Sequence, residues 1–202
     1  DKGIFDRFRN RIMFPIFHSS GKPIAFGGRT LDKDEPAKYL KSPETPLYKK
    51  RNVLYGVHIA RSAILKEKHV ILVEGYMDFL KLYQSGIESI LALSGTALTD
   101  TQVTAISRMT QKIILFYDGD TAGGDAAIRA GWIIIKGGLE PFVIQPPKGV
   151  DPDEWIDKVG KENILLKINS PDNYIRFHLN FNNSSTLRGA DLKNYIIDIA
   201  KE

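Results

Sequence analysis

Carboxylates follow two apolar runs that have the character of buried strands. One run, Ile71-Leu72-Val73, continues into Glu74-Gly75, and the other, residues 113–117, continues into Asp118-Gly119-Asp120. A further acidic set, Asp151-Pro152-Asp153, comes after the next expected strand. Clustered carboxylates raise one another's pKa unless a cation intervenes, and oxygen ligands of this kind suit Mg²⁺ or Mn²⁺. We therefore expect a divalent-cation site, with Glu74, Asp118 and Asp120 as its principal carboxylates and Asp151 and Asp153 completing it.

These acids need a scaffold that brings strand ends together. From residue 57 onward, the sequence predicts strands over 69–73, 89–93, 112–117 and 141–145, alternating with helices over 57–66, 76–84, 99–109 and 122–136. This alternation is typical of a mostly parallel sheet with helices on its faces, and ligands bind such sheets beyond the carboxyl ends of the strands. Because side chains two apart in extended chain point the same way, Asp118 and Asp120 are expected to face one site.

The flanking segments have a different character. Residues 12–17 and 23–30 predict a β-hairpin, and residues 32–56, with three prolines, predict a loop on the surface. After residue 151 only helical patterns occur, with Pro152 and Pro171 expected in first helical turns. We divide the chain into a basic N-terminal part (1–66), a central α/β part (67–150) and the start of a helical part (151–202).

Three short motifs allow two interpretations each. Asp118-Gly119-Asp120 can belong to a cation site, but an isolated Asp-Gly-Asp is often only a surface turn. The small residues of 121–127 could hold a phosphate or orient the aspartate loop at a helix N-terminus, or they could serve close helix–sheet packing. Ser94-Gly95-Thr96 is either a phosphate-facing turn or simply a turn.

Charge is unevenly distributed along the 202 residues. Residues 1–66 contain 14 Lys and Arg against 6 Asp and Glu, whereas residues 67–202 contain 14 against 18. A basic segment beside an acidic one suits an anion-binding surface next to a cation site, although ordinary solvated charge would give the same totals. The chain has no cysteine, its four histidines lack ligand spacing, and no apolar run approaches the ~20 residues of a membrane span.

The central motifs resemble a known domain. Glu74-Gly75-Tyr76-Met77-Asp78, Gly95-Thr96-Ala97 and residues 118–123 are similar to the TOPRIM domain of topoisomerases, bacterial primases, some nucleases and recombination-mediator proteins. This pattern alone does not choose among those activities. It implies a Rossmann-like fold with Glu74, Asp118 and Asp120 as catalytic residues, and it allows Glu74 to tune the site or act as a base instead of binding metal. It places Asp78, one helical turn after Glu74, as a residue that orients the site.

The basic segment narrows the resemblance. Residues 7–16 (RFRNRIMFPI), 26–29 (FGGR), 38–46 (KYLKSPETP) and 149–154 (GVDPDE) are similar to signatures of bacterial DnaG-type primases. In that family, a basic N-terminal subdomain precedes the TOPRIM fold and a helical subdomain follows it. A zinc-binding domain and a helicase-binding domain flank this core, so we expect the chain to be a fragment of a longer protein.

The resemblance implies an enzyme that synthesises RNA primers on single-stranded DNA from ribonucleoside triphosphates. It implies that the protein acts in the cytoplasm, at the bacterial replisome. It also implies that zinc is bound only by the flanking zinc-binding domain and that a replicative helicase is bound through the flanking helicase-binding domain. The template and triphosphates would contact five basic residues, Arg9, Arg11, Arg29, Lys38 and Lys50, and three aromatic residues, Phe14, Tyr39 and Tyr55, would stack on bases or pack in the core.

Some positions depart from the family pattern. Gly124 stands where arginine is frequent, and Ser94 replaces a more usual apolar residue. At position 52, where the family usually has a basic residue, this chain has Asn52, and the arginine comes one place earlier, as Arg51. Two alternatives share the acidic pattern, namely a TOPRIM nuclease or topoisomerase fragment and a non-catalytic recombination mediator. Neither explains residues 7–16 and 38–46, and such mediators usually carry a four-cysteine zinc site.

Overall fold

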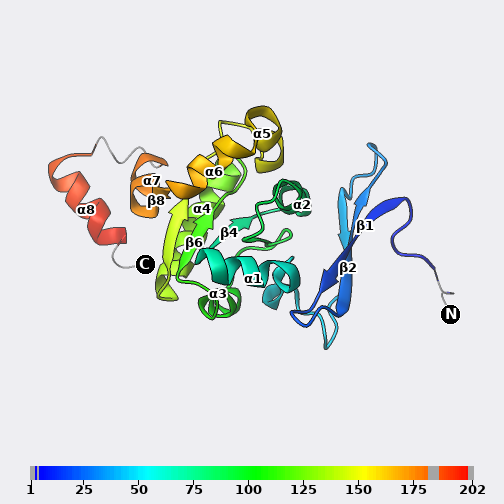
Figure 1. Ribbon diagram of the computed structural model, residues 1–202. Coiled ribbons are helices and arrows are strands. Elements are labelled where there is room, and N and C mark those ends of the chain that lie inside the picture. Colours follow the sequence, from blue (N-terminus) through cyan, green and yellow to red (C-terminus); the bar gives the residue numbers. More distant parts are fainter. Residues whose placement is uncertain (1–2, 4, 182–186, 200–202) are drawn as a thin grey trace.

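The computed structural model describes residues 3, 5–181 and 187–199 of the chain. A small antiparallel sheet of strand order β1-β2-β3 stands apart from a five-stranded sheet of order β5-β4-β6-β7-β8 (Figure 1). The small sheet contains β1 (Arg11–Phe17), β2 (Pro23–Thr30) and β3 (Tyr39–Lys41). The large sheet contains β4 (His69–Val73), β5 (Ile90–Ala92), β6 (Lys112–Leu115), β7 (Glu140–Val143) and β8 (Asp172–Asn173).

Helices cover both faces of the large sheet, as the alternating pattern predicts. One face packs against α1 (Val57–Glu67), α3 (Asp100–Ser107), α4 (Thr121–Lys136) and α7 (Tyr174–Phe181). The other face packs against α2 (Tyr76–Gln84), α5 (Pro152–Val159) and α6 (Lys161–Asn169). A 3-10 turn, η1 (Lys50–Asn52), precedes α1, and α8 (Gly189–Ile199) lies at the end of the described chain. None of the helices in the described part of the chain is long and apolar enough to cross a membrane.

The central strands are apolar along their whole length because they are buried on both faces. Val70 to Val73 of β4 and Ile113 to Leu115 of β6 have no exposed surface. Alternate residues of β4 belong to opposite cores: Leu72 packs with α1, α3 and α4, whereas Ile71 packs with α2 and α6. The expected parallel sheet is confirmed, because β5, β4, β6 and β7 all pair in parallel.

The helix starts follow local capping chemistry. Thr99 caps α3 in a capping box with Gln102, whose amide nitrogen donates to the Thr99 hydroxyl over 3.2 Å. Pro152 occupies the first turn of α5, as expected. The domain divisions at residues 66 and 150 stay a prediction, because Ala60 of α1 and Trp155 of α5 pack into the cores of the large sheet.

Two expectations about the flanking segments are corrected. Residues 32–56 are not only a surface loop: they contain β3, and Tyr48 and Leu54 are buried. Pro171 does not begin a helix, because it precedes β8, which pairs antiparallel with β7. Neither β3 nor β8 shows an alternating pattern of apolar and polar residues, because each strand is fixed by pairing with a strand that is distant in the sequence.

The small sheet is joined to the large one through aromatic packing on the first residue of α2. The ring of Phe14 stacks on that of Tyr76, with centroids 4.9 Å apart and planes 8° apart. Tyr55 meets the same ring edge-on at 4.8 Å. A Cβ atom on Gly27 of β2 would lie 2.8 Å from the Tyr76 hydroxyl oxygen, so the bare backbone of β2 fits against this ring.

Gly56, the residue before α1, is where the loop from the small sheet meets the large one. Its φ of +90° is left-handed, and a Cβ there would lie 2.1 Å from the Phe79 ring. Glycine is therefore required at this position for two reasons: the left-handed backbone angle and the close contact with the Phe79 ring.

We predict that Gly56→Ala lowers the free energy of unfolding by roughly 3 kcal/mol, combining backbone strain with overpacking. Gly138→Ala is the matched control, because its φ is +74° but nothing lies within 4 Å of the added Cβ. It should cost only the roughly 1–2 kcal/mol of backbone strain. Urea unfolding of both variants measures the difference, and equal losses would contradict the close contact with Phe79.

Candidate active site

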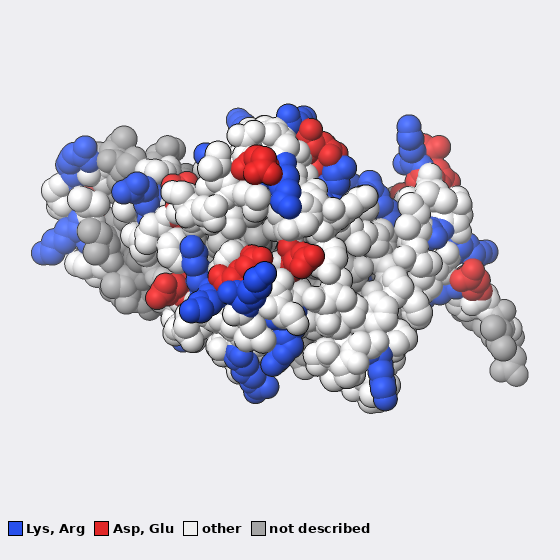
Figure 2. All heavy atoms as spheres, viewed as in Figure 1, with Lys and Arg blue, Asp and Glu red and all other residues white. Residues whose placement is uncertain are grey.

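The carboxyl ends of the parallel strands open onto one cleft of about 360 Å³. Loops after β4, β6 and β7 form one wall, which is acidic, and strands β2 and β3 of the small sheet contribute the other, which is basic. The lining residues with charged side chains are Arg29, Lys38, Lys41, Glu74, Asp78, Asp118, Asp151, Asp153 and Glu154. We call this space the acidic cleft. Figure 2 shows acidic and basic side chains adjoining on the central body of the molecule.

Glu74 stands at the end of β4, in the turn that leads into α2. Its Oε1 accepts a hydrogen bond from the Asp118 amide over 3.5 Å, and its carbonyl accepts one from the Gly95 amide over 3.3 Å. The ends of β4, β5 and β6 are thus tied together at this residue. Burial raises the pKa of the Glu74 carboxyl above its ordinary range.

Asp118 lies beyond the end of β6 and is fixed by the loop that follows β7. The Gly119 amide donates to the Val150 carbonyl over 3.0 Å, and the Gly149 amide donates to the Gly119 carbonyl over 2.9 Å. A Cβ on Gly119 would lie 2.2 Å from the Pro147 carbonyl oxygen. The close approach allowed by Gly119 brings the loop to Asp118 and delivers Asp151 to the cleft.

Asp118 has the most strongly perturbed carboxyl of the cleft. Burial, and next the negative charge of Asp78, raise its pKa to about 7. Such a shift marks a place where carboxylates gather without compensating charge, as is common at functional sites.

Asp120 has a different position from the one that extended chain predicts. The chain leaves the strand after Leu115, and Asp120 caps α4 by accepting a hydrogen bond from the Gly123 amide over 2.7 Å. Its side chain is exposed and does not line the acidic cleft, although its charge acts on Asp118 and Glu74. The start of α4 therefore orients the aspartate loop, which is one of the two interpretations of residues 121–127.

Asp78 connects two parts of the acidic wall. This side chain is 7% exposed; its Oδ2 accepts from the Gly75 amide over 3.0 Å, and its Oδ1 accepts from the Asp153 amide over 3.4 Å. Burial and the charge of Asp153 raise its pKa to about 6. Its two backbone bonds fit the expected orienting role, since they hold the turn after Glu74 against the start of α5.

The donor set has the chemistry that a divalent cation needs. Glu74, Asp118, Asp151 and Asp153 present only oxygen ligands. The pKa values of Glu74, Asp118 and Asp151 are raised, first by burial and then by neighbouring carboxylates, and a bound cation would offset both effects. In the described residues, no three His, Asp or Glu side chains converge closely enough to enclose a metal ion as they stand. The set therefore fits a hard cation in kind and position, with side-chain movement needed to complete the ligation.

The basic wall faces these acids across the cleft. Arg29 lies over the Tyr39 ring at 5.8 Å, and the charge of Lys38 acts on Asp151 by lowering its pKa against the raising effect of burial. Lys41, which sequence reasoning missed, also lines the cleft, and its Nζ donates to the Ser94 carbonyl across the two sheets. Recognising β3 would have revealed Lys41, because it shares that strand with Tyr39.

The other expected basic residues lie elsewhere. The Arg11 side chain is 4% exposed, and its guanidinium donates to the carbonyls of Gly28 and Ala37 over 3.3 and 2.8 Å, so it holds the small sheet together. Lys50 lines a small neighbouring hollow beside Lys41 rather than the cleft, and Arg9 is exposed just before β1.

The three aromatic residues expected either to stack on bases or to pack divide between these roles. Phe14 is 4% exposed and stacks on Tyr76, so it is a packing residue. Tyr55 is half-buried between Tyr76 and Phe79. Tyr39 is the one of the three that lines the acidic cleft, and it is the one available to a ligand there.

Comparison with known proteins places this geometry in a family. Residues 1–61 match the model of the N-terminal domain of the DNA primase catalytic core, and residues 71–156 match a Toprim-like model. The DNA primase of Staphylococcus aureus is 45% identical over 158 residues, which cover 78% of this chain and 26% of that protein. The DNA primase of Clostridium acetobutylicum is 40% identical over 203 residues, which cover 100% of this chain and 34% of that protein.

Solved structures agree with the sequence matches. The Aquifex aeolicus primase, solved with its zinc-binding and RNA polymerase domains, superposes with a TM-score of 0.81 at 40% identity, over 85% of this chain and 43% of that one. A DnaG primase catalytic domain bound to single-stranded DNA superposes with a TM-score of 0.78 at 39% identity, over 87% of this chain and 56% of that one. The chain thus spans about a quarter to a third of the two primase sequences and about half of these solved chains. It belongs to the family of bacterial DnaG-type DNA primases and corresponds to part of their catalytic core.

Proposed function

We propose that this chain carries the nucleotidyl-transfer site of a primase, which synthesises short RNA primers on single-stranded DNA from ribonucleoside triphosphates. The observation that carries the proposal is the opposition of an acidic and a basic wall across one cleft, in a member of this family. The reaction is attack of a ribose 3′-hydroxyl on an α-phosphate, with release of pyrophosphate. It needs positioning and charge neutralisation more than covalent help from the protein.

The acidic wall would hold one or more Mg²⁺ or Mn²⁺ ions through Glu74, Asp118, Asp120, Asp151 and Asp153. When bound, a divalent cation lowers the pKa of the attacking hydroxyl and neutralises phosphate charge. For Asp120 to join the set, its side chain must turn from the α4 cap that it makes here. Asp78 positions the others through its bonds to the Gly75 and Asp153 amides.

The basic wall would hold the triphosphate and the template backbone through Arg29, Lys38 and Lys41. The exposed Arg9 and the more distant Lys50 would extend the contact along the template, whereas Arg11 supports the sheet that carries them. Contacts of this kind are independent of sequence and weaken with salt. Cytoplasmic action at the replisome, with a helicase bound through a further domain, follows only from the family and is part of the proposal.

The direct test is primer synthesis on single-stranded DNA with four ribonucleotides, one radiolabelled, in Mn²⁺. We predict that Asp118→Asn lowers the yield by at least roughly 100-fold, because a ligand and a charge are lost while the shape is kept. Asp125→Asn is the matched control, since Asp125 is exposed on α4 and does not line the cleft. Undiminished synthesis by folded Asp118→Asn would overturn the assignment, and shortened DNA without RNA product would indicate a nuclease.

A second prediction concerns stability without divalent cations. The folded protein holds the Asp118 proton more tightly than the unfolded chain, whose aspartates titrate near 3.9, so the free energy of unfolding falls as pH rises from about 4 to about 7. Asp118→Asn has no ionisable group at this position, so it removes this fall in the free energy of unfolding. The variant should be more stable than the unaltered protein at pH 8 by roughly 1–2 kcal/mol, after allowance for solvent screening of a half-exposed group.

Urea unfolding in EDTA at pH 8 and pH 4 measures this effect. The stability difference between Asp118→Asn and the unaltered protein should shrink to a small remainder at pH 4, where the folded state holds the proton and the unfolded aspartate, with a pKa near 3.9, holds it about half of the time. A difference of the same size at both pH values would mean that packing, and not ionisation of Asp118 in its buried acidic setting, separates the two proteins.

A third prediction concerns the basic wall. Lys38→Gln should weaken binding of single-stranded DNA and reduce the salt dependence, the slope of log K against log[salt], by about one unit. Lys136→Gln, at the exposed end of α4, is the matched control and should leave the slope unchanged. Fluorescence anisotropy of a labelled oligonucleotide at several salt concentrations gives both slopes, and equal slopes would remove Lys38 from the binding face.

A further inference from the structure

Helix α7 lies along α4, and the contact between the two helices occurs twice. A Cβ atom on Gly124 of α4 would lie 2.1 Å from the Phe181 ring, and a Cβ atom on Gly131 would lie 2.0 Å from the Tyr174 ring. The glycines are two helical turns apart on α4, and the aromatic residues are two turns apart on α7 in the opposite direction. The helices are therefore antiparallel, with an aromatic ring resting on bare backbone at each end of the contact.

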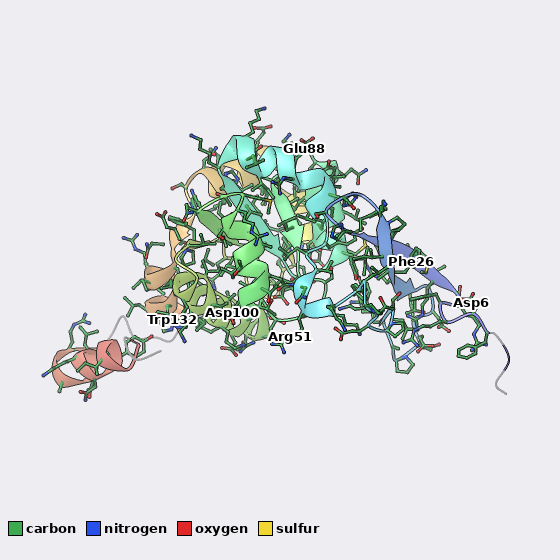
Figure 3. All side chains as sticks on the ribbon, turned by 90° about the horizontal axis from the view of Figure 1, so that it is seen from below. Asp6, Phe26, Arg51, Glu88, Asp100 and Trp132 are labelled. Carbon is green, nitrogen blue, oxygen red and sulfur yellow. The ribbon has the colours of Figure 1, made fainter. Side chains whose placement is uncertain are left out.

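The contact at Gly131 lies at the end of α7 that is farther from the acidic cleft. Figure 3 shows Trp132 of α4 beside α7, where its ring meets that of Tyr174 edge-on with centroids 5.5 Å apart. The Tyr174 hydroxyl donates a hydrogen bond to the Ile128 carbonyl over 2.7 Å. This contact joins the helices without touching the residues that line the cleft.

The contact at Gly124 lies in the first turn of α4, next to the aspartate loop. The Gly123 amide donates to Oδ1 of Asp120 over 2.7 Å, and the Gly124 amide donates to the Asp120 carbonyl over 3.1 Å. A Cβ atom on Gly123 would lie 2.2 Å from the Asp118 carbonyl oxygen. Two consecutive glycines thus contact the aspartate loop and the Phe181 ring, so only the backbone of one helical turn separates the loop from the ring.

Phe177 of α7 extends this contact toward the aspartates. Its ring stacks on that of Phe181, with centroids 5.6 Å apart and planes 29° apart, and it is 5% exposed. Phe177 lines a hollow of about 10 Å³ together with Asp118, Asp120 and Gly124. Such a space holds about one water molecule at most. The first turn of α4 therefore has almost no room to shift toward α7 while the two rings are in place.

The same contact gives a physical reason for a departure from the family pattern. At Gly124, where arginine is frequent, any side chain would enter the space that the Phe181 ring occupies. Glycine at position 124 and the aromatic ring at position 181 therefore belong together in this chain.

We propose that Phe181 is a positioning residue for the cation site of the acidic cleft. Its ring holds the first turn of α4 in place, and that turn holds the backbone of Asp118 and the carboxylate of Asp120. Without the ring, the turn can move into the vacated space, and the aspartates lose the fixed geometry that favours cation binding. The helical part of the chain thus contributes to the site without supplying a ligand. This inference rests on the proposed function of the cleft.

The test measures Mn²⁺ affinity by calorimetry and stability by urea unfolding. Phe181→Ala should weaken Mn²⁺ binding by roughly tenfold, as is usual when a residue that supports metal ligands is lost. Gly124→Ala should weaken binding to a similar degree, because the added methyl group forces the ring and the helical turn apart. Phe181→Ala leaves a cavity rather than a clash, so it keeps the proposal testable if Gly124→Ala does not fold.

Gly131→Ala is the matched control. It introduces the same overpacking between the same two helices, two turns farther along α4. It should lower the urea midpoint about as much as Gly124→Ala does, but it should leave Mn²⁺ affinity unchanged. A role of α7 in packing alone would give equal Mn²⁺ affinities in the two glycine variants.

A rescue experiment assigns the effect to the ring of Phe181. The atoms that a methyl group on Gly124 would meet are Cε2, Cζ and Cδ2 of that ring, and leucine has no counterpart of Cε2 or Cζ. Adding Phe181→Leu to Gly124→Ala should therefore restore most of the Mn²⁺ affinity that Gly124→Ala alone loses.

The outcomes separate this inference from the proposed function. Weaker Mn²⁺ binding in Phe181→Ala and Gly124→Ala, unchanged binding in Gly131→Ala and rescue by Phe181→Leu support Phe181 as a positioning residue. Full Mn²⁺ affinity in folded Phe181→Ala, equal losses in the two glycine variants, or no rescue overturns the inference and leaves the cation site standing. Failure of the unaltered chain to bind Mn²⁺ overturns both proposals.

Discussion

Carboxylates that repel one another are held at one edge of a buried parallel sheet, and the rest of the site is arranged around them. Strands β4 and β6 have no exposed side chains along most of their length, so their ends cannot move apart without opening the core. Glu74 and Asp118 are fixed at those ends, and burial with neighbouring charge raises the pKa of Asp118 to about 7. The free energy of packing thus offsets a repulsion that a divalent cation would relieve.

The position of the basic wall depends on a separate contact. The small sheet meets the large one mainly through Phe14, Tyr55 and Gly27, which surround the ring of Tyr76. Tyr76 is the residue after Gly75, so the aromatic contact that docks the small sheet stands two residues from Glu74. Arg29 and Lys38 are consequently positioned by the same turn that positions the acids. A change at this aromatic contact would therefore shift the basic wall relative to the acids without touching a charged residue.

Sequence patterns predicted the acidic wall better than the basic wall, for physical reasons. Apolar runs that end in acid identify strand ends in a parallel sheet, so the sequence alone assigns Glu74, Asp118 and Asp151 to one edge. The side-chain position of Asp120 was harder to predict, because the alternation argument assumed extended chain. Its place before a run of small helical residues was the available sign of a helix cap. Its side chain therefore points to the Gly123 amide.

The basic residues depend on strand pairing that has no local signal. Lys41 lies on a three-residue strand whose partner, β2, begins 16 residues before it, and the burial of Arg11 arises from carbonyls that pairing brings to it.

The central claim is that the cleft holds carboxylates whose repulsion a divalent cation relieves. Calorimetric titration of Mn²⁺ in buffers of different ionisation enthalpy measures the protons released on binding. Asp118 titrates near pH 7 and the pKa of Asp78 is raised to about 6. Binding at pH 6 should therefore release about one proton per ion or more, and binding at pH 8.5 close to none, and Asp118→Asn should remove most of the release at pH 6. Binding of Mn²⁺ at pH 6 without proton release, or with the same release in Asp118→Asn, would contradict the account.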